Sequence, residues 1–597
     1  MNNASLELGG TNWAEKDGNI LGYSVGDTSG KYSPQEFTFA RGSNLSATRI
    51  DRAGLIVKGR ENLLLQSNSF DNVYWNKTAS SIVTGQSDPN GGSNAFKIVE
   101  DTSTNYHRIN GEYTMVSGNI YTTSVTAKSA GRNFLTLSNN VSSGTTIFNL
   151  TNGNIEVQES NVVSASTTSL GGGWYRCEMV SVGNASGAKN VFIGADNNGV
   201  IGVYPGDGTS GIFIYQSQLE LGLAASPYIE TTTTTAQAGV LENTPRLNYT
   251  TGVANPYLLL EPSRTNLIAQ SEYFGDSYWT KIGASVVGGY SSPEGLSNAY
   301  KLVEDTSTGT HRVDSIEWIF ITGGTTVTQS VYVKANGRSI VGLQDNALGA
   351  GHAVFNLSTV TVLAVYGVSA KIETLPNGWF RISYTFVSGG SGSMPYKTGI
   401  YALDTYTSGT PLSNTYTGDG TSGLYIYGAQ LEIGSYPTSY IPTYSVSATR
   451  AADNCSKTNA SDVIGQTEGT MFLDFVYNGK SNITADNLNL ALGTWPSNII
   501  TIGQYNATLY ARIYASSVIN FFQTFGVMTI GQRYKCAIAY ANNDAVFYVN
   551  GALEGSDTSV IVPAVSSVSL NRGVYENSKQ INQALLFKTR LSNEELA

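Results

Sequence analysis

Short runs of alternating apolar and polar residues recur along most of the chain, and each run stops at glycine or another turn-forming residue. Residues 121–131 (YTTSVTAKSAG) and 328–337 (TQSVYVKANG) show this pattern. Residues 211–222 and 423–434 repeat it with aromatic and β-branched side chains. Alternation predicts half-buried strands, because successive side chains of a strand point to opposite faces. Helical periodicity is nearly absent, so the pattern predicts an all-β protein of the sandwich or jelly-roll type.

The pattern also occurs twice. Residues 93–108 (SNAFKIVEDTSTNYHR) and 297–312 (SNAYKLVEDTSTGTHR) are identical at twelve of sixteen positions. Further matches follow in the same order, among them the hexapeptide GDGTSG at 206–211 and 418–423. A single repetition over this length indicates duplicated domains, because a solenoid array has shorter and more numerous repeats.

These matches divide the chain into five expected units. They are an N-terminal attachment segment (1–60), jelly-roll module 1 (61–235), a linker (236–257), jelly-roll module 2 (258–450) and a third sandwich (455–597). The linker follows a threonine run (231–235) and contains Pro245 and Pro256, which favour an extended connector. In the third sandwich, Asn542-Asn543-Asp544 between two alternating strands predicts a hairpin. Ser592 with Glu595 predicts a capped helix at the C-terminus.

Composition narrows the classes of function. The net charge is −10, and only 13% of the residues are charged. A nucleic-acid surface needs clustered Lys and Arg, so no nucleic-acid partner is expected. The chain has no apolar stretch of membrane-spanning length and no signal-peptide pattern, so no membrane insertion is expected. The three cysteines are widely spaced and form no metal knuckle or disulfide framework, so we expect neither a metal nor any other cofactor.

The acidic pairs Glu100-Asp101 and Glu304-Asp305 are the first candidates for catalysis. Glycoside hydrolysis needs two carboxylates that flank one cleft. Adjacent residues of a strand point to opposite faces, so neither pair forms such a dyad alone. The sequence also lacks a nucleophile motif, a Ser/His/Asp spacing and a Cys-His pair. We therefore expect these acids to serve turns and capping, and we expect no enzyme.

Two donor pairs at equivalent places, His107-Arg108 and His311-Arg312, are candidates for glycan binding. Imidazole and guanidinium groups suit sugar hydroxyls and carboxylates. Alternatively, the arginines pair with the nearby Glu-Asp residues and hold a loop.

The GDGTSG repeats contain Asp207 and Asp419, which either close a tight turn or contribute to a calcium site completed by backbone carbonyls. In the third sandwich, Trp495 and Tyr505 fall in expected loops or edges and are further candidates for stacking on sugars. The paired module tryptophans are expected in the cores; they are Trp75, Trp174, Trp279 and Trp379.

Two kinds of resemblance add to this picture. Each module opens on NLLLQSNSFDNVYW (62–75) or NLIAQSEYFGDSYW (266–279) and closes on a Gln-Leu-Glu strand. This order resembles carbohydrate-binding jelly-roll modules of the galactose-binding-like type. The FYVNG and LSNEEL strings of the third unit resemble concanavalin A-like (laminin-G-like) sandwiches. The SATR tetrapeptides (46–49 and 447–450) and YLLLEPSRTNLI (257–268) resemble segments of bacteriophage fibre and virion proteins.

The resemblances imply a non-enzymatic structural virion protein of a bacteriophage, as a head fibre, a tail fibre or another capsid-attached appendage. Such a protein is assembled in the host cytoplasm, exposed on the particle and commonly homotrimeric. It would bind other virion proteins through residues 1–60 and present its sandwiches to host cell-surface glycans. Two alternatives stay open: a glycan-degrading tailspike or secreted glycosidase with accessory modules, and a purely architectural capsid decoration protein.

Overall fold

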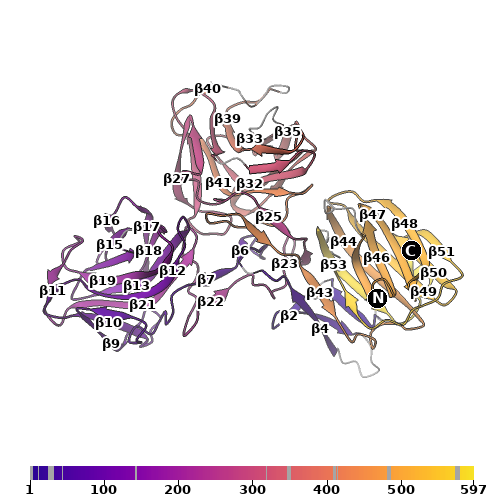
Figure 1. Cartoon of the computed structure of the whole chain (residues 1–597), viewed down its shortest axis with the longest axis horizontal. Helices are drawn as coiled ribbons and strands as arrows, with labels where there is room; N and C mark the ends of the chain where they lie inside the picture. The colour runs from indigo at the N-terminus through magenta and orange to yellow at the C-terminus, as the bar shows by residue number, and fades with distance from the viewer. Residues whose placement is uncertain are drawn as a thin grey trace.

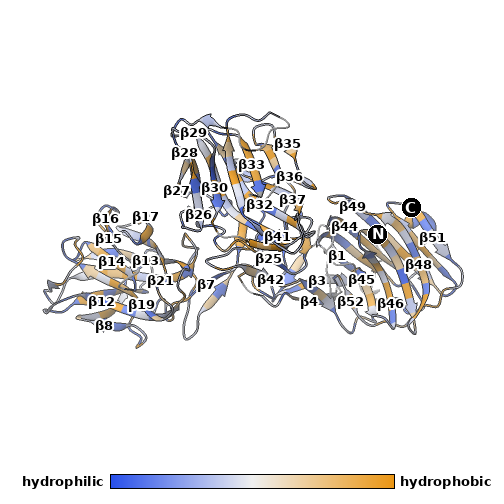
Figure 2. Cartoon of the chain, turned by 45° about the horizontal axis from the view of Figure 1, so that its top comes forward, coloured by the Kyte–Doolittle hydropathy of each residue, from blue (hydrophilic) through white to orange (hydrophobic). Residues whose placement is uncertain are grey.

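The computed structural model forms three β-sandwich lobes around a central junction (Figure 1). It describes residues 4–10, 13–24, 33–43, 45–140, 144–316, 319–345, 351–407, 412, 415–479, 486–571 and 578–597. Apolar and polar residues alternate along the strands (Figure 2). Within the described ranges, helical structure is limited to a 3-10 turn at Pro376–Gly378 and to α1 (Asn593–Leu596). The all-β prediction is confirmed.

Module 1 is a sandwich of two six-stranded antiparallel sheets. The first has the order β9 (Ser80–Gln86), β10 (Ala95–Glu100), β21 (Gly211–Leu221), β13 (Ile120–Ala130), β18 (Trp174–Val182) and β17 (Val162–Gly171). The second has the order β8 (Asn76–Thr78), β12 (His107–Met115), β19 (Gly187–Asp196), β14 (Phe134–Asn139), β15 (Thr145–Asn149) and β16 (Ile155–Gln158). A short ladder of β11 (Thr104–Asn105) and β20 (Tyr204–Pro205) lies beside them. The facing side chains form one core around Trp75, Ile98 and Ile193.

Module 2 repeats this strand order. One sheet runs β27 (Ala284–Tyr290), β28 (Ala299–Glu304), β41 (Gly423–Ile433), β32 (Thr326–Asn336), β37 (Phe380–Val387) and β36 (Ser369–Thr374). The other runs β26 (Trp279–Ile282), β30 (His311–Ser315), β39 (Thr398–Leu403), β33 (Ile340–Asp345), β34 (His352–Asn356) and β35 (Thr361–Val365). Two short ladders complete it: β29 (Thr308–Gly309) with β40 (Tyr416–Thr417), and β31 (Ile319–Thr322) with β38 (Ser393–Tyr396). The duplicated sequence therefore encodes a duplicated topology.

The third sandwich is built from both ends of the chain. Its C-terminal strands are β43 (Asn454–Lys457), β44 (Glu468–Gly479), β45 (Asp486–Thr494), β46 (Asn498–Tyr505), β47 (Thr508–Ala515), β48 (Val518–Val527), β49 (Arg533–Ala541), β50 (Asp544–Val549), β51 (Ala552–Asp557), β52 (Val568–Ser569) and β53 (Ser578–Phe587). Its N-terminal strands are β1 (Leu6–Gly9), β2 (Ala14–Lys16), β3 (Asn19–Ser24) and β4 (Ser33–Ala40). β1 pairs with β53, and β4 pairs with β43.

This pairing corrects the expectation that residues 1–60 form a separate segment. Leu6, Leu8, Ile20, Phe37 and Phe39 are buried in the same core as the apolar residues of β44, β49 and β53. Alternating apolar residues need a facing layer, and the C-terminal sheets provide it. Residues beyond Ala40 continue into the junction.

The linker expectation also needs correction. β23 (Leu247–Asn248) and β24 (Tyr257–Leu260) belong to the third sandwich, because β24 pairs with β53. β22 (Ala236–Ala238) pairs with β7 (Arg60–Asn62) at the base of module 1. The segment is thus not an extended connector. Its apolar residues, such as Leu258 and Leu260, are fully buried.

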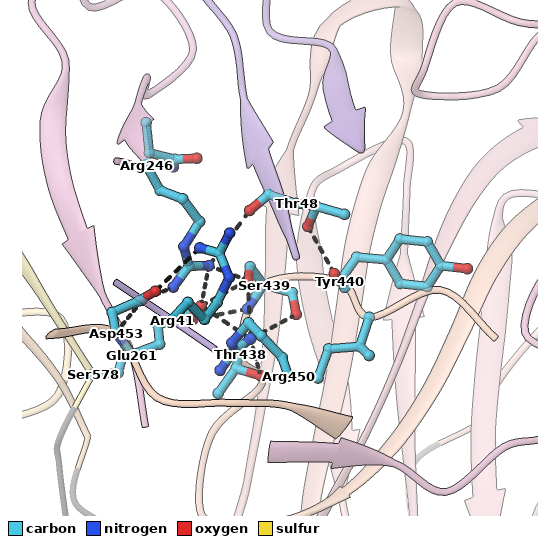
Figure 3. Close-up of polar contacts among 12 residues, drawn as sticks. Arg41, Thr48, Arg246, Glu261, Thr438, Ser439, Tyr440, Arg450, Asp453 and Ser578 are labelled. Atoms are coloured by element: carbon cyan, nitrogen blue, oxygen red, sulfur yellow. Dashed lines mark hydrogen bonds and ion pairs between the residues drawn. The ribbon is translucent and has the colours of Figure 1, made fainter. Parts of the chain in front are cut away.

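The junction contains two further ladders and a cluster of buried charges. β5 (Thr48–Ile50) pairs with β6 (Ile56–Lys58), and β25 (Arg264–Asn266) pairs with β42 (Ala448–Arg450). The arginine cluster comprises Arg41, Arg246, Glu261, Arg450 and Asp453 (Figure 3).

The arginine cluster ties module 2 to the third sandwich. Arg246 Nη1 lies 2.6 Å from Glu261 Oε2, and Arg450 Nη1 lies 3.1 Å from the same oxygen. Burial alone would raise the pKa of Glu261, but Arg450 and Arg246 outweigh it and lower the pKa to about 2. Breaking a buried pair of this kind is strongly destabilising, because it leaves an uncompensated charge.

A second cluster joins modules 1 and 2. Lys58 Nζ lies 2.6 Å from Glu272 and 2.5 Å from Glu294, while Arg60 pairs with Glu220 of module 1 and Glu294 of module 2. Figure 1 shows module 1, module 2 and the third sandwich arranged around the central junction. The second SATR tetrapeptide contributes Arg450 to the arginine cluster, and the LLLEPSRTNL string contributes Glu261. Both motifs therefore form part of the junction.

Candidate functional site

Each module contains the same set of polar contacts around one buried glutamate, which we call the clip. Within each module, the clip joins the EDTST and GDGTSG strings, which are among the stretches best preserved between the two copies. In module 1, Glu100 accepts hydrogen bonds from Arg132 Nε (2.8 Å), the Asp207 amide (2.7 Å) and Tyr204 Oη (2.8 Å). Burial alone would raise the pKa of Glu100, but Arg132, the Asp207 amide and Tyr204 outweigh it and lower the pKa. In the same way, the EDTST and GDGTSG strings of module 2 meet at Glu304.

The two aspartates of the GDGTSG repeats close tight turns. Asp207 Oδ1 accepts from the amides of Thr209 (2.8 Å) and Ser210 (2.7 Å), and Asp419 does the same in module 2. Hydrogen bonds from Ser210 and Thr209 lower the pKa of Asp207. Throughout the described ranges, no group of three or more His, Cys, Asp or Glu residues is arranged to hold a metal ion.

The predicted histidine contacts do not hold in the structure. His107 and His311 are each 1% exposed. The ring of His107 lies between the carbonyl oxygens of Ala79 (2.6 Å from Nδ1) and Tyr204 (3.1 Å from Nε2) and packs against the Tyr204 ring. His311 has equivalent contacts. Both rings fix the clip to the neighbouring strand and do not reach the surface.

Arg108 occupies a different position, because it projects from the outer face of the β8–β16 sheet. Its guanidinium carbon lies 4.0 Å from the centroid of Phe192 and 4.8 Å from that of Tyr106. A pocket of about 80 Å³ surrounds it, and Thr136, Ser138 and other polar residues line this pocket. The sequence analysis gave Arg108 as a candidate for glycan binding, and the structure places it in the lining of this pocket, among neighbours that were not foreseen.

The guanidinium of Arg108 is unpaired. Among the described residues, no carboxylate forms an ion pair with it, and its Nε has no hydrogen-bond partner. Gly194, the cross-strand neighbour of Arg108, keeps the pocket open. A Cβ atom at this glycine would lie 2.9 Å from Arg108 Cβ, so a side chain there would crowd the arginine.

The equivalent face of module 2 is closed. Arg312 Nε donates to Asp314 at 2.9 Å, and its Nη1 donates to Thr310 at 2.6 Å. Tyr401 stands where module 1 has Gly194, as the strand register shows. Tyr401 and Leu412 are buried together over this face. The predicted contact of Arg312 with a ligand is therefore not supported: Arg312 already has partners, and the pocket is filled.

Trp495 and Tyr505 of the third sandwich are exposed to 37% and 48%. Trp495 lies in the turn before β46, whereas Tyr505 is the last residue of that strand. Trp495 packs on Arg512 at 4.4 Å. Arg512 in turn pairs with Asp486 at 3.1 Å.

The framework residues that sequence reasoning placed in the core lie there. Trp75, Trp279, Trp174 and Trp379 are all buried. The three cysteines are free and buried, and burial raises the pKa of each thiol. None of the helices in the described part of the chain is long and apolar enough to cross a membrane.

Comparisons with known proteins assign this chain to no family. No family model matches the sequence, and no curated protein matches it. Among solved structures, the chain is similar to the CBM40 module of a Ruminococcus gnavus IT-sialidase bound to α2,3-sialyllactose, with 16% identity over 22% of this chain and 82% of that chain and a TM-score of 0.18.

It is also similar to the tandem CBM22 domains of Paenibacillus barcinonensis Xyn10C, with 12% identity, coverage of 66% and 99%, and a TM-score of 0.20. A third similar structure is the LG4-5 pair of mouse laminin α1, with 8% identity, coverage of 54% and 87%, and a TM-score of 0.17. Identities and scores this low carry no argument about fold, ligand or activity.

Proposed function

We propose that the chain is a non-enzymatic glycan-binding protein, displayed on a bacteriophage particle as a fibre or appendage. One observation carries the binding part of this proposal. Arg108 holds an unpaired guanidinium between the rings of Phe192 and Tyr106, on an open face lined by Thr136 and Ser138. The virion part rests on the resemblance of the SATR and LLLEPSRTNL segments to phage proteins.

The chemistry of the Arg108 pocket suits a sugar. Guanidinium N–H groups donate to hydroxyl or carboxylate oxygens, and the neighbouring aromatic rings offer apolar faces to a pyranose ring. A shallow pocket of this size binds weakly on its own. Display of many copies on one particle, in the homotrimer that we propose, would raise the avidity without new contacts.

The acids that could support hydrolysis have other roles. Glu100 and Glu304 are held in the clips, where arginine, tyrosine and amide donors occupy their oxygens. Hydrolysis with two carboxylates needs both acids at one cleft. This arrangement favours binding over degradation. Oligosaccharides released from host capsule on incubation with the protein would contradict that part of the proposal.

A glycan array probed with the labelled full-length chain tests the binding. We expect a defined set of host-surface glycans to bind, and Arg108→Ala to weaken that binding by about tenfold or more, because the guanidinium donates charge-assisted hydrogen bonds. Arg312→Ala is the matched control, since Arg312 is already paired with Asp314. The proposal fails if no glycan binds, or if both variants behave alike. Point variants are preferable to truncation at residue 455, which would strip the partners from β1 and β4.

A further inference from the structure

A cavity of about 600 Å³ lies where module 2, the junction and the third sandwich meet. Residues of β5, β24, β36, β37 and β53 line it. Cavities of this size at domain boundaries are a common location of small-ligand sites. The walls include five tyrosines together with hydroxyl and amide side chains; the tyrosines are Tyr249, Tyr257, Tyr332, Tyr436 and Tyr440.

Arg381 of β37 lines this cavity and is the counterpart of Arg176 in module 1. The strand register shows that the two arginines are equivalent. Glu178 lies opposite Ser124 of β13, and Ser383 lies opposite Ser330 of β32. In module 1, Arg176 Nε lies 3.7 Å from Glu178, two residues along the same strand face. Module 2 has Ser383 at that position, so Arg381 has lost the carboxylate neighbour that its counterpart retains.

The guanidinium of Arg381 is buried without an ion-pair partner. Its residue is 9% exposed, its Nη2 donates to Ser330 Oγ at 3.0 Å, and its Nε has no partner. Three carboxylates act on it through space, namely Glu373, Glu432 and Glu261, but none lies within ion-pair distance. Glu373 lies directly opposite Arg381 on the neighbouring strand and pairs with Lys371. Glu432 accepts from Gln430 and Thr438, and Glu261 pairs within the arginine cluster. No described carboxylate lies within ion-pair distance of Arg381.

Arg49, from the first SATR tetrapeptide, is a second cation in the same wall. Its Nε has no partner, and its Nη1 donates to the Leu247 carbonyl at 3.3 Å. Lys371 also lines the cavity, but it pairs with Glu373 at 2.6 Å, so these two charges cancel. The cavity therefore contains two guanidinium groups that form no ion pair with a carboxylate of the described residues.

A buried cation without an anion is unfavourable for the protein alone, and a guanidinium fork fits the oxygens of a carboxylate, sulfate or phosphate. Tyrosine rings and hydroxyl side chains suit the ring and hydroxyls of a sugar. We propose that this cavity binds an acidic sugar, with its oxyanion held by Arg381 and assisted by Arg49. The site is separate from the Arg108 pocket, so the failure of either proposal leaves the other standing.

Isothermal titration calorimetry of the full-length chain tests this site with four probes. They are trigalacturonate (carboxylate), a heparin-derived disaccharide (sulfate), glucose 6-phosphate (phosphate) and neutral galactotriose. We expect at least one anionic probe to bind and the neutral trisaccharide not to bind. Arg381→Gln should weaken the binding by about tenfold or more, as the loss of one partner of a buried charge pair does. Ser383→Glu should have the same effect, because it gives Arg381 the internal partner that Arg176 has.

Further variants separate this site from the Arg108 pocket and from a structural role. Arg108→Ala should leave the binding of the anionic probe unchanged, and Arg381→Lys should retain part of it. Without ligand, Arg381→Gln should unfold at the same or a higher temperature than the wild type, because it removes an unpaired buried charge. The proposal is overturned if no anionic probe binds, if Arg381→Gln and Ser383→Glu leave binding unchanged, or if Arg108→Ala abolishes it.

Discussion

Modules 1 and 2 share a fold, a clip and a strand order, but they leave different arginines unpaired. Module 1 exposes Arg108 in an open pocket, whereas the equivalent Arg312 of module 2 is paired and covered. The relationship reverses on the opposite sheet. There Arg176 of module 1 pairs with a carboxylate two residues along its own strand, whereas Arg381 of module 2 forms no ion pair within the described residues and faces a cavity.

The reversal shows how little sequence change separates a paired arginine from an unpaired one. In both cases the deciding residue lies two positions along the same strand and therefore on the same face. Beside Arg108 module 1 has Asn110, whereas beside Arg312 module 2 has the carboxylate of Asp314. Beside Arg176 module 1 has the carboxylate of Glu178, whereas beside Arg381 module 2 has Ser383. The two free arginines also differ in setting: the Arg108 pocket lies within one module, whereas the Arg381 cavity needs the junction and the third sandwich as well.

Release of the junction is expected to have the largest effect and to separate the two sites. Glu261→Gln leaves Arg246 and Arg450 without their shared carboxylate, which should cost about 4 kcal/mol of stability at the junction. We expect hydrogen exchange to rise in β24, β25 and β42 and binding at the Arg381 cavity to be lost. Glycan binding at Arg108 should persist. Equal loss of both binding activities would show that the Arg108 pocket also depends on the junction.

Acid should release the same contact. The pKa of Glu261 is lowered from its ordinary value to about 2. This lowering of the pKa corresponds to about 3 kcal/mol of folding stability. The stabilisation is fully present above pH 4.5 and is lost as the pH falls through about 2. Small-angle scattering should show the three-lobed shape down to about pH 3 and an expansion below it. Expansion that begins near pH 4.5 would contradict the assigned role of this carboxylate.

The clips should behave alike in the two copies, which gives the comparison an internal standard. Glu100→Gln and Glu304→Gln each weaken the same set of arginine, tyrosine and amide contacts, and each should destabilise its own module by about 3 kcal/mol. Hydrogen-exchange mass spectrometry can assign the loss to module 1 or module 2. A difference of more than about 1 kcal/mol between the variants would mean that the copies have diverged in framework as well as in their arginines.

A smaller effect is expected when the neutralised arrangement of module 2 is transferred to module 1. Asn110→Asp places a carboxylate beside Arg108, as Asp314 lies beside Arg312. Glycan affinity should fall by about tenfold, or about 1.4 kcal/mol, with little change in stability. The reverse variant Asp314→Asn should gain no binding, because Tyr401 still fills that face. Unchanged affinity in Asn110→Asp would exclude a role for the free charge of Arg108.

Much of the architecture could be predicted from local patterns. The Asn542-Asn543 turn joins β49 and β50, with Asn543 in the left-handed region at φ 62°, and Ser592 caps α1 with Glu595. These features depend on neighbours in sequence. The pairing of β1 with β53 could not be predicted, because an alternating strand indicates that a face is buried but not which distant strand covers it.

The site residues illustrate the same limit. Arg108 stood out because it recurs as Arg312, yet the repeat gave no indication that one is free and the other paired. The sequence gave the two histidines as donors to a glycan alongside the arginines. Both histidine rings are buried beside the clip, so they are not available to a ligand at the surface. Arg381 could be noticed only by aligning Glu178 with Ser383, and its meaning depends on a cavity that three distant parts of the chain create.

The smallest expected effect concerns Arg176. Glu178→Ser gives module 1 the arrangement that leaves Arg381 unpaired in module 2, and the 3.7 Å pair that it removes is partly exposed. We expect a loss of less than about 1 kcal/mol, measured as the thermal unfolding of module 1, and no new binding of acidic sugars by calorimetry. Arg176 Nη2 still donates to the Ser226 carbonyl at 2.7 Å, so its guanidinium remains engaged. New binding of an acidic sugar would show that an unpaired arginine is sufficient, and that the cavity around Arg381 is not what distinguishes the two copies.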